Sequence, residues 1–338
     1  MLTWTAAPVT VVVPATSANL GPGFDALGLA LTLYDTVEAR VASAGTEVQV
    51  SGVGAADVGR GEKHLVVRAM RAAFATIGAQ PPGIALKCRN EVPQGFGLGS
   101  SAAAIVAGLV AARELAGPAG FAALPPDTLL RLATELEGHP DNVAACLYGG
   151  LTISWTVSAR PGSAGSGPGG NGSAGIESPG SGAGRVRAAR LTPLPELAPV
   201  LCIPNAPLST EAARQVLPAD VPHRLAAANS ARVALLVAAL TSRPDLLLDG
   251  TEDFLHQPYR DAAMPATATL ISRLRAAGVA AVVSGAGPSV LALTVTGNGK
   301  PGADVARIAG DSGQDWRVLP LGVDADGARV LPGPSDSP

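Results

Sequence analysis

The chain has 338 residues, of which 47% are hydrophobic, 15% charged and 3% aromatic, and its formal net charge is −3. This length and balance allow two globular domains with apolar cores and exclude a disordered chain. The small net charge gives no field that would attract nucleic acid or an anionic membrane, so we expect neither as a partner.

The cysteines and the N-terminal region favour a soluble, cytoplasmic protein. Cys88, Cys146 and Cys202 are far apart and show no metal-ligand spacing, and two of them lie in apolar runs, which favours buried, reduced thiols. No Lys or Arg precedes Arg40, so the positive region of a signal peptide is missing. No uninterrupted apolar run reaches the ~18 residues that a membrane-spanning helix needs. The oligomeric state is left open, with a homodimer among the options.

The first half of the chain is predicted to combine strands rich in Val and Thr with helices that show apolar periodicity. The expected strands are residues 9–18, 35–52, 83–92 and 151–158. The expected helices are residues 64–77, 100–115, 127–138 and 139–150. Asp127 is placed to cap the third of these helices, and Pro140 lies near the first turn of the fourth.

The second half begins after a stretch, residues 159–184, that is almost pure Gly, Ser, Pro and Ala. We expect a flexible insertion there and assign it no function. Beyond it we predict a strand at 199–205, helices at 229–240 and 266–278, and two apolar segments around a glycine loop at 279–295. The mixed order of strands and helices predicts an α+β protein. The predicted division is an N-terminal lobe (1–158), the insertion (159–184) and a C-terminal lobe (185–338).

Three glycines in five residues, Gly95, Gly97 and Gly99, directly precede Ser100 and Ser101 and an alanine-rich helix. A helix that starts at such a turn directs free N–H groups and the positive end of its dipole outward, which suits a phosphate. No Lys follows, as a Walker loop requires, and the even spacing differs from a dinucleotide fingerprint. The two serines occupy positions where an N-cap is expected, so we favour an anion site over a helix start built only for close packing.

Four ordered motifs give the chain a resemblance to the GHMP small-molecule kinases. The first, "PATSANLGPGFDALGLAL" at 14–31, has the form that the homoserine kinases of this family carry. The others are "PQGFGLGSSAAA", "ELEGHPDNVAACLYGG" and "VSGAGPSVLAL". The resemblance implies a two-lobed α+β fold, with an N-terminal lobe like domain 2 of ribosomal protein S5 and a ferredoxin-like C-terminal lobe. It also implies phosphorylation of the side-chain hydroxyl of L-homoserine by ATP to O-phospho-L-homoserine, in threonine biosynthesis.

The resemblance implies specific roles for residues of these motifs, because phosphoryl transfer depends mainly on positioning and charge. ATP phosphates would be bound by Pro93, Gln94, Gly95, Phe96, Gly97, Leu98, Gly99, Ser100, Ser101, Ala102 and Ala103. Mg²⁺ would be held by Ser100, Ser101 and Glu137, since it prefers oxygen ligands. His64 is placed near the adenine, and the loop 284–289 is expected to pack against the phosphate loop from the second lobe.

The substrate would be held as a zwitterion, with arginine forks for its carboxylate and oxygen acceptors for its ammonium. The substrate residues implied by the resemblance are Asn19, Asp25, His139, Asn142, Thr210, Arg214 and Arg260. Asn142 is expected to support Asp25, and Thr210 and Arg214 are four apart and so share one helical face. The spacing from Glu137 to His139 is shorter than in many homoserine kinases.

Some alternatives stay open at this level. Asp25 or Asp141 could act as a catalytic base, or the bound hydroxyl could attack directly and pass its proton to the phosphate. A different small alcohol as the substrate of a GHMP kinase, or a non-catalytic protein of the same fold that senses its ligand, are the competing functions. The presence of Glu137 and both loop serines argues against the sensor.

Overall fold

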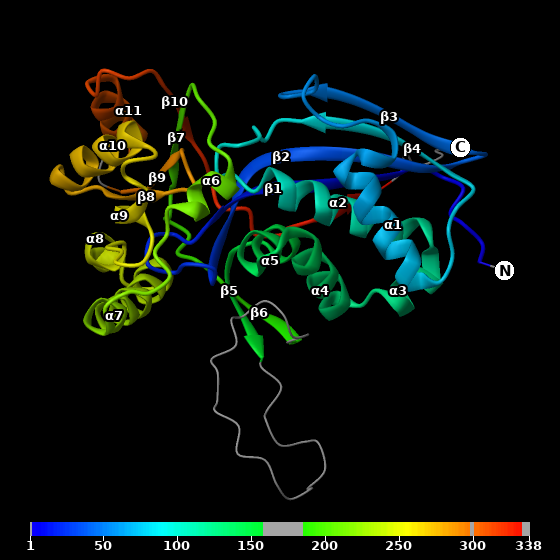
Figure 1. Cartoon of the computed structure of the whole chain (residues 1–338), viewed down its shortest axis with the longest axis horizontal. Coiled ribbons are helices and arrows are strands. Elements are labelled where there is room, and N and C mark those ends of the chain that lie inside the picture. The colour runs from blue at the N-terminus through cyan, green and yellow to red at the C-terminus, as the bar shows by residue number, and fades with distance from the viewer. Residues whose placement is uncertain (1, 158–184, 298–300, 333–338) are drawn as a thin grey trace, which may run out of the picture.

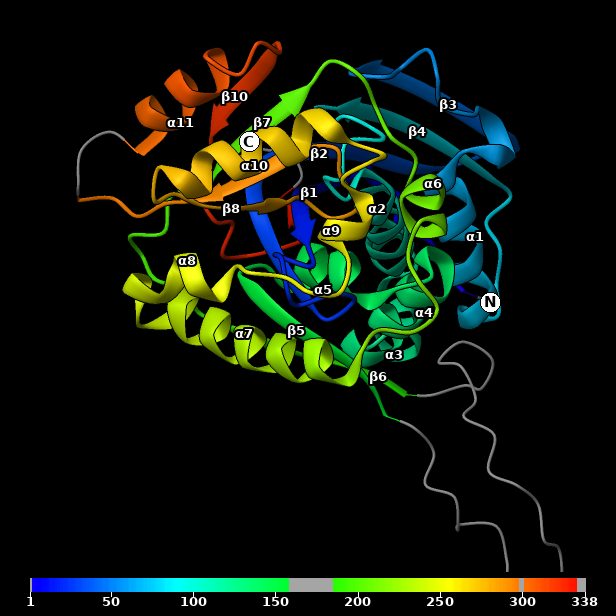
Figure 2. The same ribbon diagram turned by 60° about the vertical axis from the view of Figure 1, so that its left-hand side comes forward.

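The computed structural model describes residues 2–157, 185–297 and 301–332. Within these ranges the chain forms two sheets with helices packed on them, which confirms the predicted two-lobed α+β class (Figure 1). The predicted flexible insertion lies outside the described residues. The first sheet and its helices occupy one end of the molecule, and the second sheet with the remaining helices occupies the other (Figures 1 and 2).

The first sheet has seven strands in the order β11-β1-β2-β4-β3, with β5 pairing to β2 and to β6. All its pairs are antiparallel except β3 with β4. Its strands are β1 (Val9–Ala18), β2 (Leu27–Ala42), β3 (Gly45–Gly52), β4 (Gly83–Asn90), β5 (Leu151–Val157), β6 (Arg185–Leu191) and β11 (Arg329–Leu331). Strands β6 and β11 follow the predicted insertion in the chain and yet belong to this sheet, so the predicted lobe boundaries do not coincide with the sheets.

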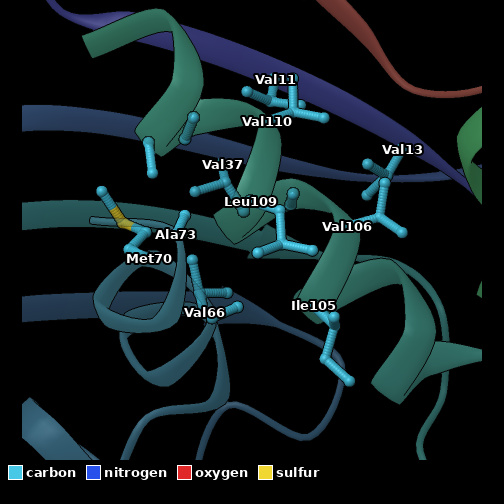
Figure 3. Close-up of a cluster of buried hydrophobic side chains, with 14 of the residues drawn as sticks. Val11, Val13, Val37, Val66, Met70, Ala73, Ile105, Val106, Leu109 and Val110 are labelled. Atoms are coloured by element: carbon cyan, nitrogen blue, oxygen red, sulfur yellow. The ribbon is translucent and has the colours of Figure 1, made fainter. Parts of the chain in front are cut away.

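Five helices gather on one face of the first sheet (Figure 1). They are α1 (Leu65–Ile77), α2 (Ser100–Leu115), α3 (Gly117–Ala123), α4 (Pro126–Glu137) and α5 (Pro140–Tyr148). Helix α2 is apolar on nearly all sides because it is surrounded by the sheet and its neighbours. At Gly108 a Cβ atom would lie 2.8 Å from Ala69 Cβ, so this glycine permits the close approach of α1 and α2. Figure 3 shows the resulting core of valines from β1 and β2 against Met70 and Leu109.

The second sheet is antiparallel with the order β10-β7-β9-β8. Its strands are β7 (Val200–Pro204), β8 (Ala280–Val283), β9 (Val290–Leu293) and β10 (Trp316–Pro320). The helices at this end are α6 (Thr210–Gln215), α7 (His223–Thr241), α8 (Leu247–Gly250), α9 (Gln257–Arg260), α10 (Pro265–Ala276) and α11 (Pro301–Gly310). Two short 3₁₀ helices, Gly61–Lys63 and Pro244–Leu246, complete the elements.

The second sheet packs on both faces, which joins the two ends of the molecule. Residues such as Cys202 and Val290 face α10 and α11. On the other side Leu201 and Val282 lie in one apolar cluster with Leu236 of α7 and with Leu29 of the first sheet. This shared cluster places the loops between β1 and β2, and between β8 and β9, on a rigid base.

Helix α7 is long and apolar enough, by length and composition alone, to cross a membrane. Four of its residues, Asn229, Leu236, Ala239 and Leu240, are buried within the fold. Leu236 and Leu240 are fully buried, and buried Asn229 donates from Nδ2 to Pro22 O at 2.8 Å. These contacts are those of a helix that packs on a protein core.

Several sequence predictions need correction. Asp127 does not cap α4, because the Pro125–Pro126 pair starts the helix one residue earlier and puts Asp127 inside its first turn. Neither loop serine is an N-cap: Gly99 holds that position in a left-handed conformation, and α2 begins at Ser100. The single strand expected at 35–52 is two strands, and the first of them begins at Leu27.

Candidate active site

A cleft of about 420 Å³ lies where the loops of the two sheets meet. Most of the residues singled out in the sequence line it, although they come from segments that are far apart in the chain, from Asn19 to Arg260. They are Asn19, Pro93, Gln94, Gly95, Gly97, Leu98, Gly99, Ser100, Ser101, Ala103, Glu137, His139, Asn142, Thr210, Arg214 and Arg260. Phe96 and Ala102 are not among the lining residues: Ala102 is fully buried, and Phe96 packs against the shared apolar cluster. Asp25 joins the site through Arg214.

The glycine turn is held between the two sheets. Gly95, Gly97 and Gly99 all have left-handed φ angles of 67° to 78°, which only glycine adopts readily. A Cβ at Gly97 would overlap the carbonyl oxygen of Ser284 and lie 2.8 Å from Gly287 N. Ser284 Oγ also donates to Gly97 O at 2.8 Å. The expected packing of the loop 284–289 against the phosphate loop is therefore present.

Ser101 and Glu137 meet at the start of α2. Ser101 Oγ donates to Glu137 Oε1 at 2.6 Å, and Glu137 is the last residue of α4. Burial raises the pKa of Glu137, and the hydrogen bond from Ser101 and the charge of His139 offset this only in part. Among the residues that the structure describes, no three His, Cys, Asp or Glu side chains form a metal cluster. A cation here would therefore depend on hydroxyl and carboxylate oxygens together with those of its ligand.

Next to this pair, His139 is the N-cap of α5 and is fixed by a buried carboxylate. His139 Nδ1 lies 2.7 Å from Asp141 Oδ1, and the same oxygen accepts the backbone N–H of Asn142 at 2.7 Å. Burial alone would lower the pKa of His139, but the hydrogen bond and charge of Asp141, with the charge of Glu137, raise it overall. Asn142 Oδ1 accepts from Thr16 Oγ1 at 2.8 Å, so its side chain supports β1 and not Asp25 as the resemblance implied.

The loop between β1 and β2, residues 19–26, contains strained backbone angles and is fixed by side-chain hydrogen bonds. We call it the substrate loop. Asn19, Leu20 and Asp25 have φ angles of 66°, 52° and 53°, a region that non-glycine residues rarely adopt. Asn19 Oδ1 accepts the N–H of Asp25 at 2.9 Å, and Asn19 Nδ2 donates to Gly285 O at 2.8 Å. Asn19 thus ties the loop to itself and to the second sheet.

Two guanidinium groups face the substrate loop. Arg214 of α6 forms a fork on Asp25, with Nη2 to Oδ1 at 2.6 Å and Nη1 to Oδ2 at 3.3 Å. Arg260 is 1% exposed and donates from Nε to Ala213 O at 2.9 Å. Burial, and then the charge of Arg214, lower the pKa of Arg260 to about 10. Both guanidinium carbons lie over the Phe24 ring, at 5.5 and 5.7 Å from its centre.

The cleft is also lined by apolar side chains, among them Val13, Val37 and Val66. His64 lies there, 6% exposed, and its Nδ1 has no hydrogen-bond partner among the described residues. Burial and then the charge of Arg60 lower the pKa of His64. A buried ring nitrogen without a protein partner in the lining of a cleft is a candidate hydrogen-bonding group for a heteroaromatic ligand.

Sequence reasoning did not find Thr16, Phe24 or His256. Thr16 lies in a buried run of β1 and reads as a strand residue, and Phe24 reads as an apolar residue of a turn. His256 is 0% exposed and contacts Arg260, its neighbour one helical turn ahead. Only the i, i+4 spacing of His256 and Arg260 could have indicated that pair.

Known proteins match this chain over nearly its whole length. Residues 64–150 match the GHMP kinases N terminal domain, and residues 235–311 match the GHMP kinases C terminal domain. Homoserine kinase from Streptomyces coelicolor is 50% identical over 97% of this chain and 96% of its own length. Homoserine kinase from Clavibacter michiganensis is 47% identical over 95% of this chain and 93% of its own.

Solved structures give the same picture. The crystal structure of homoserine kinase from Cytophaga hutchinsonii superposes with a TM-score of 0.76 at 26% identity, covering 98% of this chain and 100% of that one. Mevalonate diphosphate decarboxylase from Staphylococcus aureus, at 15% identity and a TM-score of 0.62 over 96% of this chain and 98% of its own, shares the fold.

Proposed function

The chain belongs to the homoserine kinases of the GHMP kinase family, and from this premise we propose how its cleft binds and phosphorylates its substrate. The protein is an ATP-dependent kinase that converts L-homoserine to O-phospho-L-homoserine. One observation carries the assignment of the cleft: the glycine turn, the Ser101–Glu137 pair and Arg214, which is hydrogen-bonded to Asp25, all border the same space. A phosphate site and a site for a zwitterion therefore lie side by side.

The triphosphate would lie along residues 93–103, where backbone N–H groups and the start of α2 supply donors and positive potential. Glu137 and Ser101 present a carboxylate and a hydroxyl 2.6 Å apart at that helix start. Both are hard oxygen donors, so they would hold Mg²⁺ together with phosphate oxygens, and Ser100 lies next to them. Bound Mg²⁺ would supply charge neutralisation of the transferring phosphoryl group.

The amino-acid end of the substrate would lie between the two arginines and the substrate loop. Asp25 and Arg214 place a carboxylate and a guanidinium next to each other, which matches the ammonium and carboxylate of an amino acid. Arg260 adds a second, buried guanidinium, and its pKa of about 10 keeps it charged at neutral pH. Thr210 lies at the start of α6 on the same wall.

The proton of the substrate hydroxyl has two routes in this site. Asp141 is 1% exposed, and its Oδ1 already interacts with His139 and the Asn142 amide. We therefore assign Asp141 to orienting His139 and not to receiving the proton. Direct attack by the hydroxyl, with transfer of its proton to the phosphate, and proton acceptance by Asp25 are the routes that remain.

The test is ADP release from MgATP with L-homoserine, D-homoserine, L-serine, L-threonine, mevalonate and galactose. We expect turnover with L-homoserine to exceed that with every other alcohol, and to be lost when EDTA removes Mg²⁺. Preferred turnover of mevalonate or galactose would overturn the substrate and leave the phosphate site intact. ATP binding without turnover of any alcohol would favour a sensor.

We also propose a compartment for the enzyme. All three cysteines are buried free thiols, and burial raises the pKa of Cys88 and of Cys202 to about 12. Thiols in this state suit a reducing compartment, so we place the enzyme in the cytoplasm.

A further inference from the structure

His256 is the one fully buried histidine with both ring nitrogens engaged among the residues that the structure describes. Its Nε2 lies 2.7 Å from Gly21 O, and its Nδ1 lies 2.9 Å from Arg260 Nη1. A carbonyl oxygen can only accept and a guanidinium can only donate. The ring is therefore neutral, with Nδ1 as the acceptor and Nε2–H as the donor.

The surroundings of His256 hold this ring in place. Asp253 Oδ2 accepts the backbone N–H of His256 at 3.2 Å and of Gln257 at 2.7 Å, which fixes the turn before α9. The ring also stacks on Phe24 of the substrate loop, with centroids 5.1 Å apart and planes tilted by 30°. Its position is thus set from α9 on one side and from the substrate loop on the other.

Resting on the proposed function, we propose that His256 is a positioning residue for the substrate carboxylate. It couples the Arg260 guanidinium to the substrate loop at Gly21. Because Arg260 Nε donates to Ala213 O, next to Arg214, one network orients both arginines. A guanidinium has five N–H donors, so these two bonds leave three for the substrate.

A buried, satisfied histidine could instead serve the core alone, and two variants separate the roles. In His256→Gln the side-chain amide nitrogen can replace Nε2 and keep the bond to Gly21 O, while the acceptor for Arg260 is lost. In His256→Asn the side-chain oxygen can replace Nδ1 and keep Arg260, while the bond to Gly21 is lost. Each variant thus removes one hydrogen bond and keeps the other.

The measurements are kcat and KM for L-homoserine and for ATP, with urea unfolding of each variant. Losing a hydrogen bond to a charged group costs tenfold or more. We therefore expect His256→Gln to raise the KM for L-homoserine about tenfold or more and to leave the KM for ATP within about twofold. His256→Asn should raise the KM for L-homoserine less than about threefold and lower kcat, because the substrate loop loses an anchor.

Two controls connect the effect to the carboxylate. With L-homoserine amide, which lacks the carboxylate, the KM ratio between His256→Gln and the natural protein should fall towards one. In an Arg260→Lys background, His256→Gln should add less than about twofold to KM. Equal changes in the KM values for homoserine and ATP, or equal KM effects of the two variants, would overturn the proposal in favour of a core role.

One measurement needs no variant and no turnover. Nitrogen-15 NMR of the ring in the full chain at pH 7.5 should show a neutral imidazole with the proton on Nε2. A protonated ring, or the proton on Nδ1, would overturn the proposal even if the kinase assignment holds. Absence of homoserine turnover with the expected ring spectrum would instead overturn the proposed function.

Discussion

Gly97→Ala tests whether the glycine turn and the loop 284–289 form one rigid unit. A left-handed φ costs an alanine about 1–2 kcal/mol, and Gly97 has φ 71°. Its Cβ would also lie 2.8 Å from Gly287 N and 2.9 Å from Gly287 O, and both are backbone atoms that cannot rotate away. Moving the loops apart would cost the bond from Ser284 Oγ as well, worth about 1 kcal/mol. The expected loss is on the order of 3 kcal/mol.

Gly45→Ala is the matched control, since Gly45 has the same φ of 71° and a Cβ there would meet no atom within 4 Å. It measures the backbone cost alone, about 1–2 kcal/mol. Comparing the urea unfolding of the two variants therefore isolates the contact between the loops. We expect the unfolding free energy of Gly97→Ala to be lower than that of Gly45→Ala by at least about 1 kcal/mol.

The same two variants separate stability from function. Gly97→Ala should raise the KM for ATP, and Gly45→Ala should not, because Gly45 lies at the start of β3 away from the cleft. Equal unfolding free energies for the two variants, with an unchanged KM for ATP, would refute the close packing of the two glycine loops.

Substitutions at three further positions have expected outcomes. Asp35→Ala should lower the unfolding free energy by about 2–3 kcal/mol, because it removes the acceptor of the buried Val92 N–H and of the partly buried Glu91 N–H. Asp35→Asn keeps an acceptor oxygen, so its unfolding free energy should fall by less than about 1 kcal/mol. Because burial raises the pKa of Asp35, the natural protein loses stability as pH rises through that titration, and the unfolding free energy of Asp35→Asn should rise relative to it. Glu137→Gln should lower kcat at least about a hundredfold at fixed MgATP and weaken the Mg²⁺ dependence, with an unfolding free energy that does not fall. Burial, foremost, lowers the pKa of His256 below its unfolded value of about 6.5. The neutral ring therefore contributes stability above that pH. This stability is lost as pH falls, at up to about 1.4 kcal/mol per pH unit. The unfolding free energy of His256→Gln, measured with urea, should therefore fall less between pH 7 and pH 5 than that of the natural protein. The charged groups that face His256 are Asp253, Arg260 and Asp25.

The parts of the fold that sequence reasoning predicted are those set by local chemistry. Val and Thr runs gave β1, and the glycine turn marked the start of α2 correctly even though the cap was assigned to the wrong residue. The pairing of β6 with β5 and of β11 with β1 could not be predicted, because it joins segments on both sides of the insertion. Such pairings depend on which surfaces meet in space and not on periodicity.

The candidate site divides in the same way. Asn19 and the glycines were found because a short motif carries them, but their contacts with Gly285 and Ser284 cross more than 180 residues. Arg260 was selected by motif, and nothing in its local sequence indicates that it is almost completely buried. Arginine side chains are mostly exposed to solvent in proteins, so the sequence alone predicts an exposed Arg260.

Burial of Arg260 is what makes its contribution more than a surface charge. A guanidinium in water attracts a carboxylate weakly, while one removed from water acts in a lower dielectric and with a fixed direction. The cost appears as a pKa lowered to about 10, yet about three pH units still separate that value from neutrality, so the group stays charged. Ala213 O, the His256 ring and the Phe24 face meet its N–H groups and its plane. None of these three partners carries a charge when His256 is neutral. The carboxylates of Asp25 and Asp253 offset the lowering of the Arg260 pKa only in part, so the guanidinium charge stays available to a substrate carboxylate.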